Sequence, residues 1–160
     1  MILAIDPGTT QSAYCILRND GQVVSFGKLE NSTLLLNIRT NRDIFDDETR
    51  VCVEMVASYG MPVGREVFET VVWIGRFMQA VDHFGWIPSQ RVYRKDVKMC
   101  LCGQTAKVND AVIRQALIDM YGGKDRAIGN KKNPGPCYGM KADVWAALAV
   151  GVTFLRQGGF

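Results

Sequence analysis

The chain has 160 residues, of which 48% are hydrophobic and 22% are charged. This composition predicts one globular domain over residues 1–160 and excludes a disordered or collagen-like chain. Lys and Arg outnumber Asp and Glu by 19 to 16, a net charge of +3 that is too small to mark the whole chain as a polyanion binder. Residues 91–141, however, hold eleven basic and four acidic residues, a local charge of +7. This excess fits a polyanionic partner and an ordinary solvated surface equally well.

Cysteine usage and hydropathy bear on location. The five cysteines are an odd number and mostly have apolar neighbours, which indicates buried free thiols and a reducing, cytoplasmic environment. The chain opens on an apolar strand instead of a signal peptide, and the absence of a run of about 18 apolar residues predicts that no segment spans a membrane. Cys100, Cys102 and the single histidine, His83, have the wrong spacing for a zinc site.

The first half of the chain predicts an antiparallel meander, because Asp6–Thr10 and Asn19–Gly21 are turn signals between β-prone runs. The predicted elements are strands over residues 2–5, 12–18 and 22–29, a helix capped by Asn31 or Ser32 that runs to about Arg42, a loop over 43–48, and a buried strand over 50–54. The last of these strands ends in Glu54.

The second half alternates helices and one strand. Apolar residues of segment 65–84 are spaced 4, 3, 4, 3, which predicts a long helix, and further apolar positions widen its stripe. The stripe is wider than one sheet face needs, so we expect a second covering surface, such as another subunit. The remaining predicted elements are a strand over 91–94, a helix over 108–121 with Val108, Ala111, Val112, Ala116 and Met120 inward, an exposed, basic and mobile connection over 124–139, and a helix over 142–156.

This order predicts an α/β fold. A three-strand meander followed by alternating strands and helices favours a five-stranded mixed sheet, in which the meander is joined by two parallel strands and helices cover both faces.

Three carboxylates occupy positions that favour a metal site. Asp6 and Glu54 each end an apolar strand, and Asp143 lies in the opening turn of the last helix. If the two strands are parallel neighbours, both side chains emerge at the carboxyl edge of the sheet, where such folds bind ligands. Mg²⁺ prefers oxygen ligands, and two such ions activate water and stabilise the leaving oxygen of a phosphodiester. Three unrelated surface acids, or a helix cap at Asp143, are the alternatives.

Four sequence blocks together resemble the RuvC family of Holliday junction resolvases, in particular its short phage-borne branch. They are Ile2–Thr10, Val51–Glu54, the run from Val97-Lys98 through Gly103 and Lys107 to Val112, and Ala142–Ala149. The resemblance implies a ribonuclease H-like fold, a homodimer and nicking of four-way or related branched DNA, in DNA recombination and repair, in the cytoplasm of a bacterium or phage-infected host. It also implies Mg²⁺, with Mn²⁺ able to substitute, held by Asp6, Glu54 and Asp143.

The chain departs from the family pattern at two places. The family usually has a fourth acid or a histidine three residues from the acid of the last helix, where this chain has Met140 and Ala146. Lys141 has two interpretations. It lies close enough to the site to contact a phosphate or a nucleophilic water, or it is an ordinary exposed lysine. Tyr59, five residues after Glu54, takes the place of the family's junction-stacking aromatic, and either stacks on an unpaired base or packs on its own loop.

The resemblance gives the basic residues a role in holding DNA phosphates against the acidic centre. The residues expected on this route are Arg94, Lys95, Lys98, Lys107, Lys131 and Lys132. No segment resembles a recognition helix, so we expect branched shape to be recognised. We also expect the helix over 65–84 to form the homodimer contact that cutting two symmetry-related strands requires.

Two alternatives stay open. A branched-DNA-binding protein of the same fold could have lost its chemistry with the fourth ligand. The Asp6–Thr10 turn also resembles the phosphate loop of sugar kinases and actin-like ATPases, but those proteins close two such domains around the nucleotide. One domain without a second phosphate loop argues against a nucleotide cofactor.

Overall fold

The computed structural model describes residues 1–40, 48–58, 60–83 and 89–158. Its strands are β1 (Ile2–Asp6), β2 (Gln11–Leu17), β3 (Val23–Glu30), β4 (Arg50–Met55) and β5 (Gln90–Tyr93). Its helices are α1 (Asn31–Thr40), α2 (Arg65–His83), α3 (Arg94–Cys102), α4 (Asp110–Met120), α5 (Lys124–Ala127) and α6 (Ala142–Arg156). None of these helices is long and apolar enough to cross a membrane.

The five strands form one mixed sheet in the order β3-β2-β1-β4-β5. β1, β2 and β3 pair antiparallel, whereas β4 runs parallel to β1 and β5 runs parallel to β4. The predicted meander plus two parallel strands is therefore confirmed. Because β1 and β4 are parallel neighbours, their carboxyl ends, at Asp6 and Glu54, meet at the same edge of the sheet.

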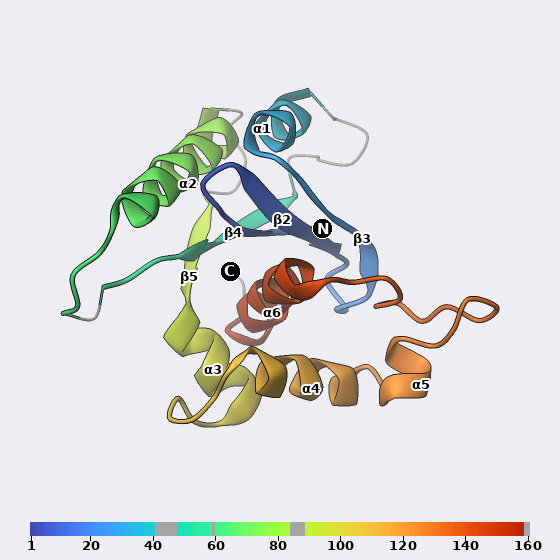
Figure 1. The fold of residues 1–160 in the computed structure, drawn as a ribbon. Coiled ribbons are helices and arrows are strands. Elements are labelled where there is room, and N and C mark those ends of the chain that lie inside the picture. Colours follow the sequence, from blue (N-terminus) through green and yellow to red (C-terminus); the bar gives the residue numbers. More distant parts are fainter. Residues whose placement is uncertain (41–47, 59, 84–88, 159–160) are drawn as a thin grey trace.

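Helices cover both faces of the sheet (Figure 1). Ile2 and Ala4 of β1 face the core beneath α6, and Leu3 and Ile5 face the core beneath α1 and α2. All four side chains are fully buried, since successive residues of a strand point to opposite faces. Strand β1 is thus apolar throughout until Asp6.

Helix α6 lies between the sheet and the layer formed by α3 and α4 (Figure 1), and ten of its fifteen residues are buried. Gly151 permits the close approach to the sheet. A Cβ atom at Gly151 would lie 2.6 Å from Leu17 Cδ1 and 3.0 Å from the Ala4 Cβ atom. This close packing of α6 on β1 and β2 fixes where the first turn of α6, with Asp143, lies relative to the end of β1.

Helix α3 was not predicted. The expected strand over 91–94 is β5, which ends at Tyr93, and Arg94 begins α3. The Tyr93 backbone N–H donates to Asp96 Oδ2 at 3.2 Å, a capping contact, and the helix ends at Gly103 with φ of 69°. Both residues are ordinary helix-end signals. The helix escaped prediction because it buries only Val97 and so has little apolar periodicity.

The buried faces of α2 and α4 also differ from the prediction. α4 buries Ile113, Leu117 and Ile118, whereas Val112 and Met120 are exposed. The larger branched side chains of Ile113, Leu117 and Ile118 pack in the same core as α6, which turns the other face of α4 to solvent. On α2, Phe77 is fully buried, whereas Val71, one of the residues with the 4, 3, 4, 3 spacing, is 37% exposed.

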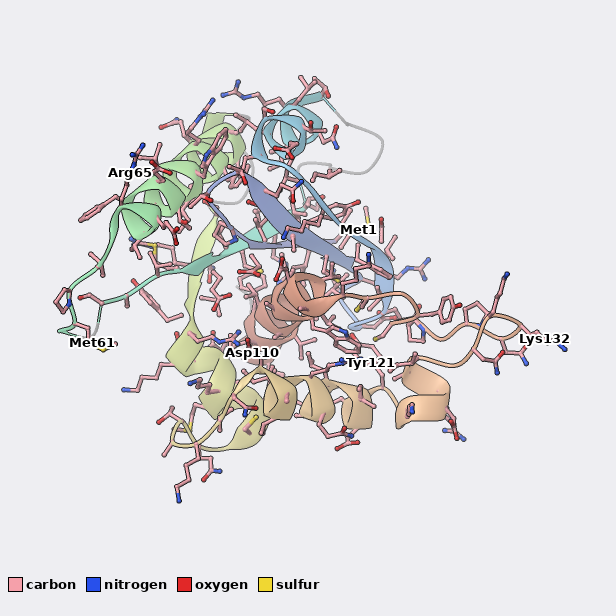
Figure 2. The ribbon with its side chains drawn as sticks, viewed as in Figure 1. Met1, Met61, Arg65, Asp110, Tyr121 and Lys132 are labelled. Carbon is pink, nitrogen blue, oxygen red and sulfur yellow. The ribbon has the colours of Figure 1, made fainter. Side chains whose placement is uncertain are left out.

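The connection over 124–139 contains structure that was not predicted. It holds α5 and then a tight turn in which Gly129 and Pro134 form an isolated β-bridge. Asn130 Oδ1 accepts hydrogen bonds from the backbone N–H groups of Lys132 and Asn133. Figure 2 shows this turn projecting from the body, with Lys132 near its tip. All five cysteines are free thiols, but only Cys15, Cys52 and Cys137 are buried as predicted.

Candidate active site

A buried polar network fixes the turn that follows Asp6 at the end of β1. Ser12 Oγ donates to Asn31 Oδ1 at 2.6 Å, and Asn31 Nδ2 donates to the Gly8 carbonyl at 2.9 Å. The Gly8 backbone N–H donates to Ser12 Oγ at 3.2 Å. Ser12 and Asn31 are almost fully buried. Asn31 was expected to cap a helix, but its side chain instead ties down the turn that follows Asp6.

Glu54 lies beside Asp6 on the neighbouring parallel strand, one position after the Ile5–Val53 pair. The pKa of Asp6 is raised to about 8, chiefly by burial and then by the Glu54 charge, a hydrogen bond with Glu54 and the Asp143 charge, while the Arg94 charge opposes the increase. Burial also raises the pKa of Glu54, against Arg94 and the hydrogen bond with Asp6. Two desolvated carboxyl groups therefore share this spot, and the pair retains a proton at neutral pH.

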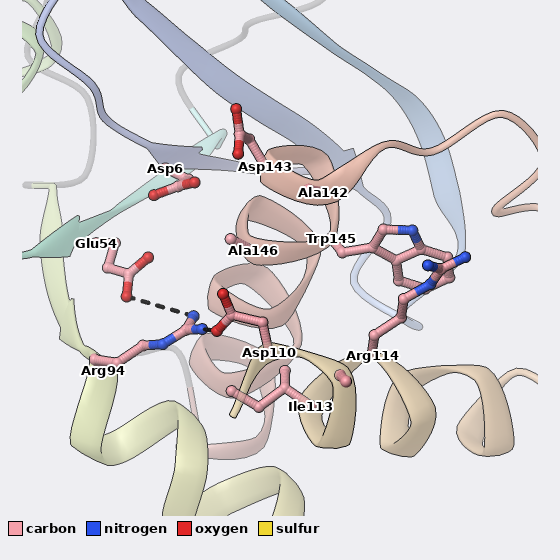
Figure 3. Close-up of a pocket in the computed structure, with 11 residues that line it drawn as sticks. Asp6, Glu54, Arg94, Asp110, Ile113, Arg114, Ala142, Asp143, Trp145 and Ala146 are labelled. Carbon is pink, nitrogen blue, oxygen red and sulfur yellow. Dashed lines mark hydrogen bonds and ion pairs between the residues drawn. The ribbon is translucent and has the colours of Figure 1, made fainter. Parts of the chain in front are cut away.

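Arg94 connects two acids of the site. As the first residue of α3 it places Nη1 3.7 Å from Glu54 Oε1, and its guanidinium also pairs with Asp110, the first residue of α4 (Figure 3). The Arg94 side chain is 28% exposed and that of Asp110 is 90% exposed. Arg94 thus offsets the charge that desolvation makes costly at Glu54.

Asp143 enters from the first turn of α6 and forms an ion pair with Lys28 of β3. Both side chains are about half exposed, at 49% and 43%. Asp143 is therefore the most accessible of the three predicted acids, and it raises the pKa of Asp6 through its charge.

A cavity of about 450 Å³ brings these groups together, and Figure 3 shows its lining. Asp6, Glu54 and Asp143 lie on its wall with Arg94 and Asp110, and Ile113, Trp145 and Ala146 are among its apolar lining residues. Within the described ranges, no three His, Cys, Asp or Glu side chains are already close enough together to hold a metal ion. The carboxylates of this cavity are instead engaged by Lys28, by Arg94 and by one another.

The positions flanking Asp143 supply no fourth acid. Met140 is 8% exposed, and its carbonyl accepts a hydrogen bond from Trp145 Nε1. Ala146 lies on the cavity wall. Lys141 is exposed directly before α6 and is not part of that wall. Tyr59 lies outside the described residues.

The predicted basic residues occupy three places. Arg94 lies inside the acidic cavity. Lys95 and Lys98 are on α3, and Lys107 follows it in a left-handed backbone conformation with φ of 58°. Lys131 and Lys132 lie on the projecting turn, where Figure 2 shows Lys132 near the tip, and neither residue lines the acidic cavity. The structure therefore brings only Arg94 of this set into the cavity.

Three residues of the site region were missed from sequence. Asp110 read as an ordinary acid near the start of a helix, and Lys28 as a polar position of a strand. Arg114, on the cavity wall, places its guanidinium carbon 5.2 Å from the centroid of the Trp145 ring. A cation over an aromatic face at this distance is attracted by the ring quadrupole. Sequence spacing gave no signal for Lys28, because its place depends on strand register.

Comparison with known proteins identifies the fold. No family model matches the sequence, and no curated protein matches it. Two solved structures are similar over 98% of this chain: Thermus thermophilus RuvC in complex with a Holliday junction substrate, with 15% identity, 95% coverage of that chain and a TM-score of 0.65, and Thermus thermophilus RuvC, with 18% identity, 96% coverage and a TM-score of 0.61. The chain therefore has a ribonuclease H-like α/β fold. Its fold is that of these two RuvC structures, as the sequence resemblance predicted.

Proposed function

We propose that this protein is a structure-selective endodeoxyribonuclease that nicks four-way or related branched DNA, intermediates of recombination and repair, by metal-assisted hydrolysis. The observation that carries the proposal is that Asp6, Glu54 and Asp143, from β1, β4 and α6, line one cavity at the carboxyl edge of the parallel strands. Ligand sites of open α/β sheets lie at this edge. The similarity to a RuvC structure that contains a Holliday junction substrate supports the choice of DNA.

Asp6, Glu54 and Asp143 would hold the divalent cations, Mg²⁺ or Mn²⁺. Their oxygens are the ligands that these hard ions prefer. Burial is the main cause of the raised pKa values of Asp6 and Glu54, and a bound cation would offset the cost of ionising these buried carboxyl groups. Asp143 has to leave Lys28, which its half-exposed side chain can do by rotation. Bound ions would supply an activated water and stabilise the leaving oxygen. Lys141, beside this turn, would contact the phosphate or the water.

DNA binding would rest on basic residues in the cavity, on and after α3, and on the projecting turn. The residues proposed for phosphate contacts are Arg94, Lys95, Lys98, Lys107, Lys131 and Lys132. Such contacts position a strand without reading its sequence, which suits recognition by shape. Tyr59 would stack on an unpaired base near the junction.

A homodimer through α2 would place two such cavities on one junction. On this helix Phe68 and Val72 remain 62% and 61% exposed, and Val71 is 37% exposed. Exposed large apolar side chains grouped on one helix mark interaction surfaces. A two-fold axis through this helix would relate the two cutting sites as it relates the two strands to be cut.

The test is cleavage of a synthetic four-way junction by the purified protein in Mg²⁺. We expect paired nicks at symmetry-related strands, abolished by EDTA and by Asp6→Asn, with a linear duplex of the same sequence left uncut. Junction binding without nicking by the wild-type protein, in either Mg²⁺ or Mn²⁺, would favour the alternative of a non-catalytic branched-DNA-binding protein. That alternative is supported by Met140 and Ala146, which occupy the positions where a fourth acid would be expected.

A further inference from the structure

Lys28 reaches the acidic cavity from the third strand of the meander. The register pairs Asp6 with Ala13 and Ala13 with Lys28. Residues paired across antiparallel strands project from the same face of the sheet, so Asp6 and Lys28 share a face about 10 Å apart, two strand spacings. Ala13 between them is buried and carries only a methyl group, which leaves room above it for the long Lys28 side chain. The ammonium then pairs with Asp143 of α6.

A second cavity lies at this ion pair. It has a volume of about 290 Å³, and it is lined by Asp6, Asp143, Lys28 and Ala13 together with the turn from Pro7 to Gln11. It therefore shares Asp6 and Asp143 with the larger cavity. In the described part of the chain, Lys28 is the one basic side chain on its wall. Lys28 and the two carboxylates thus line one polar hollow together with the hydroxyl and backbone groups of this turn.

The Lys28–Asp143 pair is suited to exchange. Both side chains are about half exposed, and ion pairs in contact with solvent are weak. Divalent cations bind carboxylate oxygens more strongly than an exposed ammonium does. Once Asp143 binds a cation, Lys28 has no carboxylate partner in this pair and lies next to the hollow. A lysine ammonium is a compact charge that binds phosphate oxygens well.

We propose that Lys28 exchanges Asp143 for a phosphate of the bound DNA strand when the carboxylates take up their cation. This inference rests on the proposed nuclease function and adds a phosphate-binding residue to its site. Lys28 then has two states, and DNA binding depends on it only in the cation-loaded state.

The test uses Lys28→Met, which removes the charge and keeps most of the length, and Lys28→Arg, which keeps the charge. Arg39→Met, an exposed position on α1 across the sheet, is the control for loss of one positive charge. Calorimetry measures Mn²⁺ affinity of the DNA-free protein. Fluorescence anisotropy measures affinity for a four-way junction in EDTA and in Ca²⁺, with a gel to verify that the DNA stays uncut.

We expect Lys28→Met to bind Mn²⁺ about 3- to 10-fold more tightly, because the competing ammonium is gone. We expect it to bind the junction about 5- to 20-fold more weakly in Ca²⁺, because a charged hydrogen bond is lost, with little change in EDTA. Lys28→Arg should retain the Ca²⁺-dependent affinity, and Arg39→Met should match the wild type in all three measurements.

Two results would overturn the inference. One is a Mn²⁺ affinity that is unchanged or weakened in Lys28→Met, since Lys28 would then not compete for Asp143. The other is a loss of junction affinity that is equal in EDTA and Ca²⁺, since Lys28 would then act as a constant charge. Either result with normal wild-type cleavage rejects only the role of Lys28. Failure of the wild-type protein to nick any junction would reject the proposed function itself. The two failures can be distinguished, because the Mn²⁺ and junction affinities are measured without cleavage.

Discussion

Asp6→Asn is predicted to stabilise the metal-free protein while abolishing cleavage. The pKa of Asp6 is about 8 in the folded protein against 3.8 ordinarily, so the folded protein keeps a proton that the unfolded chain releases above about pH 4. At pH 7, about 3 pH units above the unfolded pKa, this costs about 4 kcal/mol of folding free energy at about 1.4 kcal/mol per unit. Part of that cost belongs to Glu54, which shares the hydrogen bond. We therefore expect Asp6→Asn to raise the free energy of unfolding by about 2–4 kcal/mol at pH 7.

The sign of the pH dependence follows from the raised pKa. The stability contributed by protonated Asp6 is complete below about pH 4 and is lost as the pH rises through 8. Urea unfolding in EDTA from pH 5 to 8 should therefore show the wild-type free energy of unfolding falling with pH and a shallower fall for Asp6→Asn.

Asp143→Asn serves as the control for this experiment, because Asp143 is about half exposed and should change stability by less than about 1 kcal/mol. Equal stability of wild type and Asp6→Asn across this pH range would refute the desolvated carboxylate pair on which the account of the site rests.

The other predictions concern cleavage, DNA binding and packing. Glu54→Gln and Asp143→Asn should each lower cleavage by about 100-fold or more while junction affinity, measured by gel shift in EDTA, stays unchanged or rises; parallel losses of binding and cleavage would contradict the assignment. The double variant Lys131→Ala/Lys132→Ala should reduce the slope of log affinity against log salt by about 2, and an unchanged slope would remove the projecting turn from the DNA path. Gly151→Ala should cost about 1–3 kcal/mol in urea unfolding, because its methyl group would meet Leu17 and Ala4; wild-type stability would show that α6 packs less tightly on the sheet.

The strands and the last helix could be predicted because their apolar residues are continuous or strongly periodic. The same reasoning placed Asp6 and Glu54 at one sheet edge, since parallel neighbouring strands end together, and the structure has them there. Helix α3 was missed because one buried residue, Val97, gives no periodicity. The predicted inward face of α4 was wrong at Val112 and Met120, which are exposed. The neighbouring face, with Ile113, Leu117 and Ile118, packs in the core with α6 instead.

Residues that reach the site through strand register or helix packing could not be predicted. Lys28 meets Asp143 across 115 residues of chain, and only the Asp6–Ala13–Lys28 row explains why. Asp110 reaches the cavity because α3 and α4 begin side by side, so that Arg94 bridges Glu54 and Asp110. Neither arrangement leaves a spacing pattern in the sequence. Lys28 and Asp110 are consequently residues of the site that only the structure identifies.

The proposed nuclease function requires that Asp6, Glu54 and Asp143 share divalent cations. The most direct measurement is a crystal structure of the protein soaked in Mn²⁺, with the ions located by anomalous scattering. We expect anomalous peaks at about 2.0–2.3 Å from carboxylate oxygens of all three residues, with Asp143 turned away from Lys28. Well-ordered crystals at millimolar Mn²⁺ that show Asp143 still paired with Lys28 and no ion between the three carboxylates would contradict it.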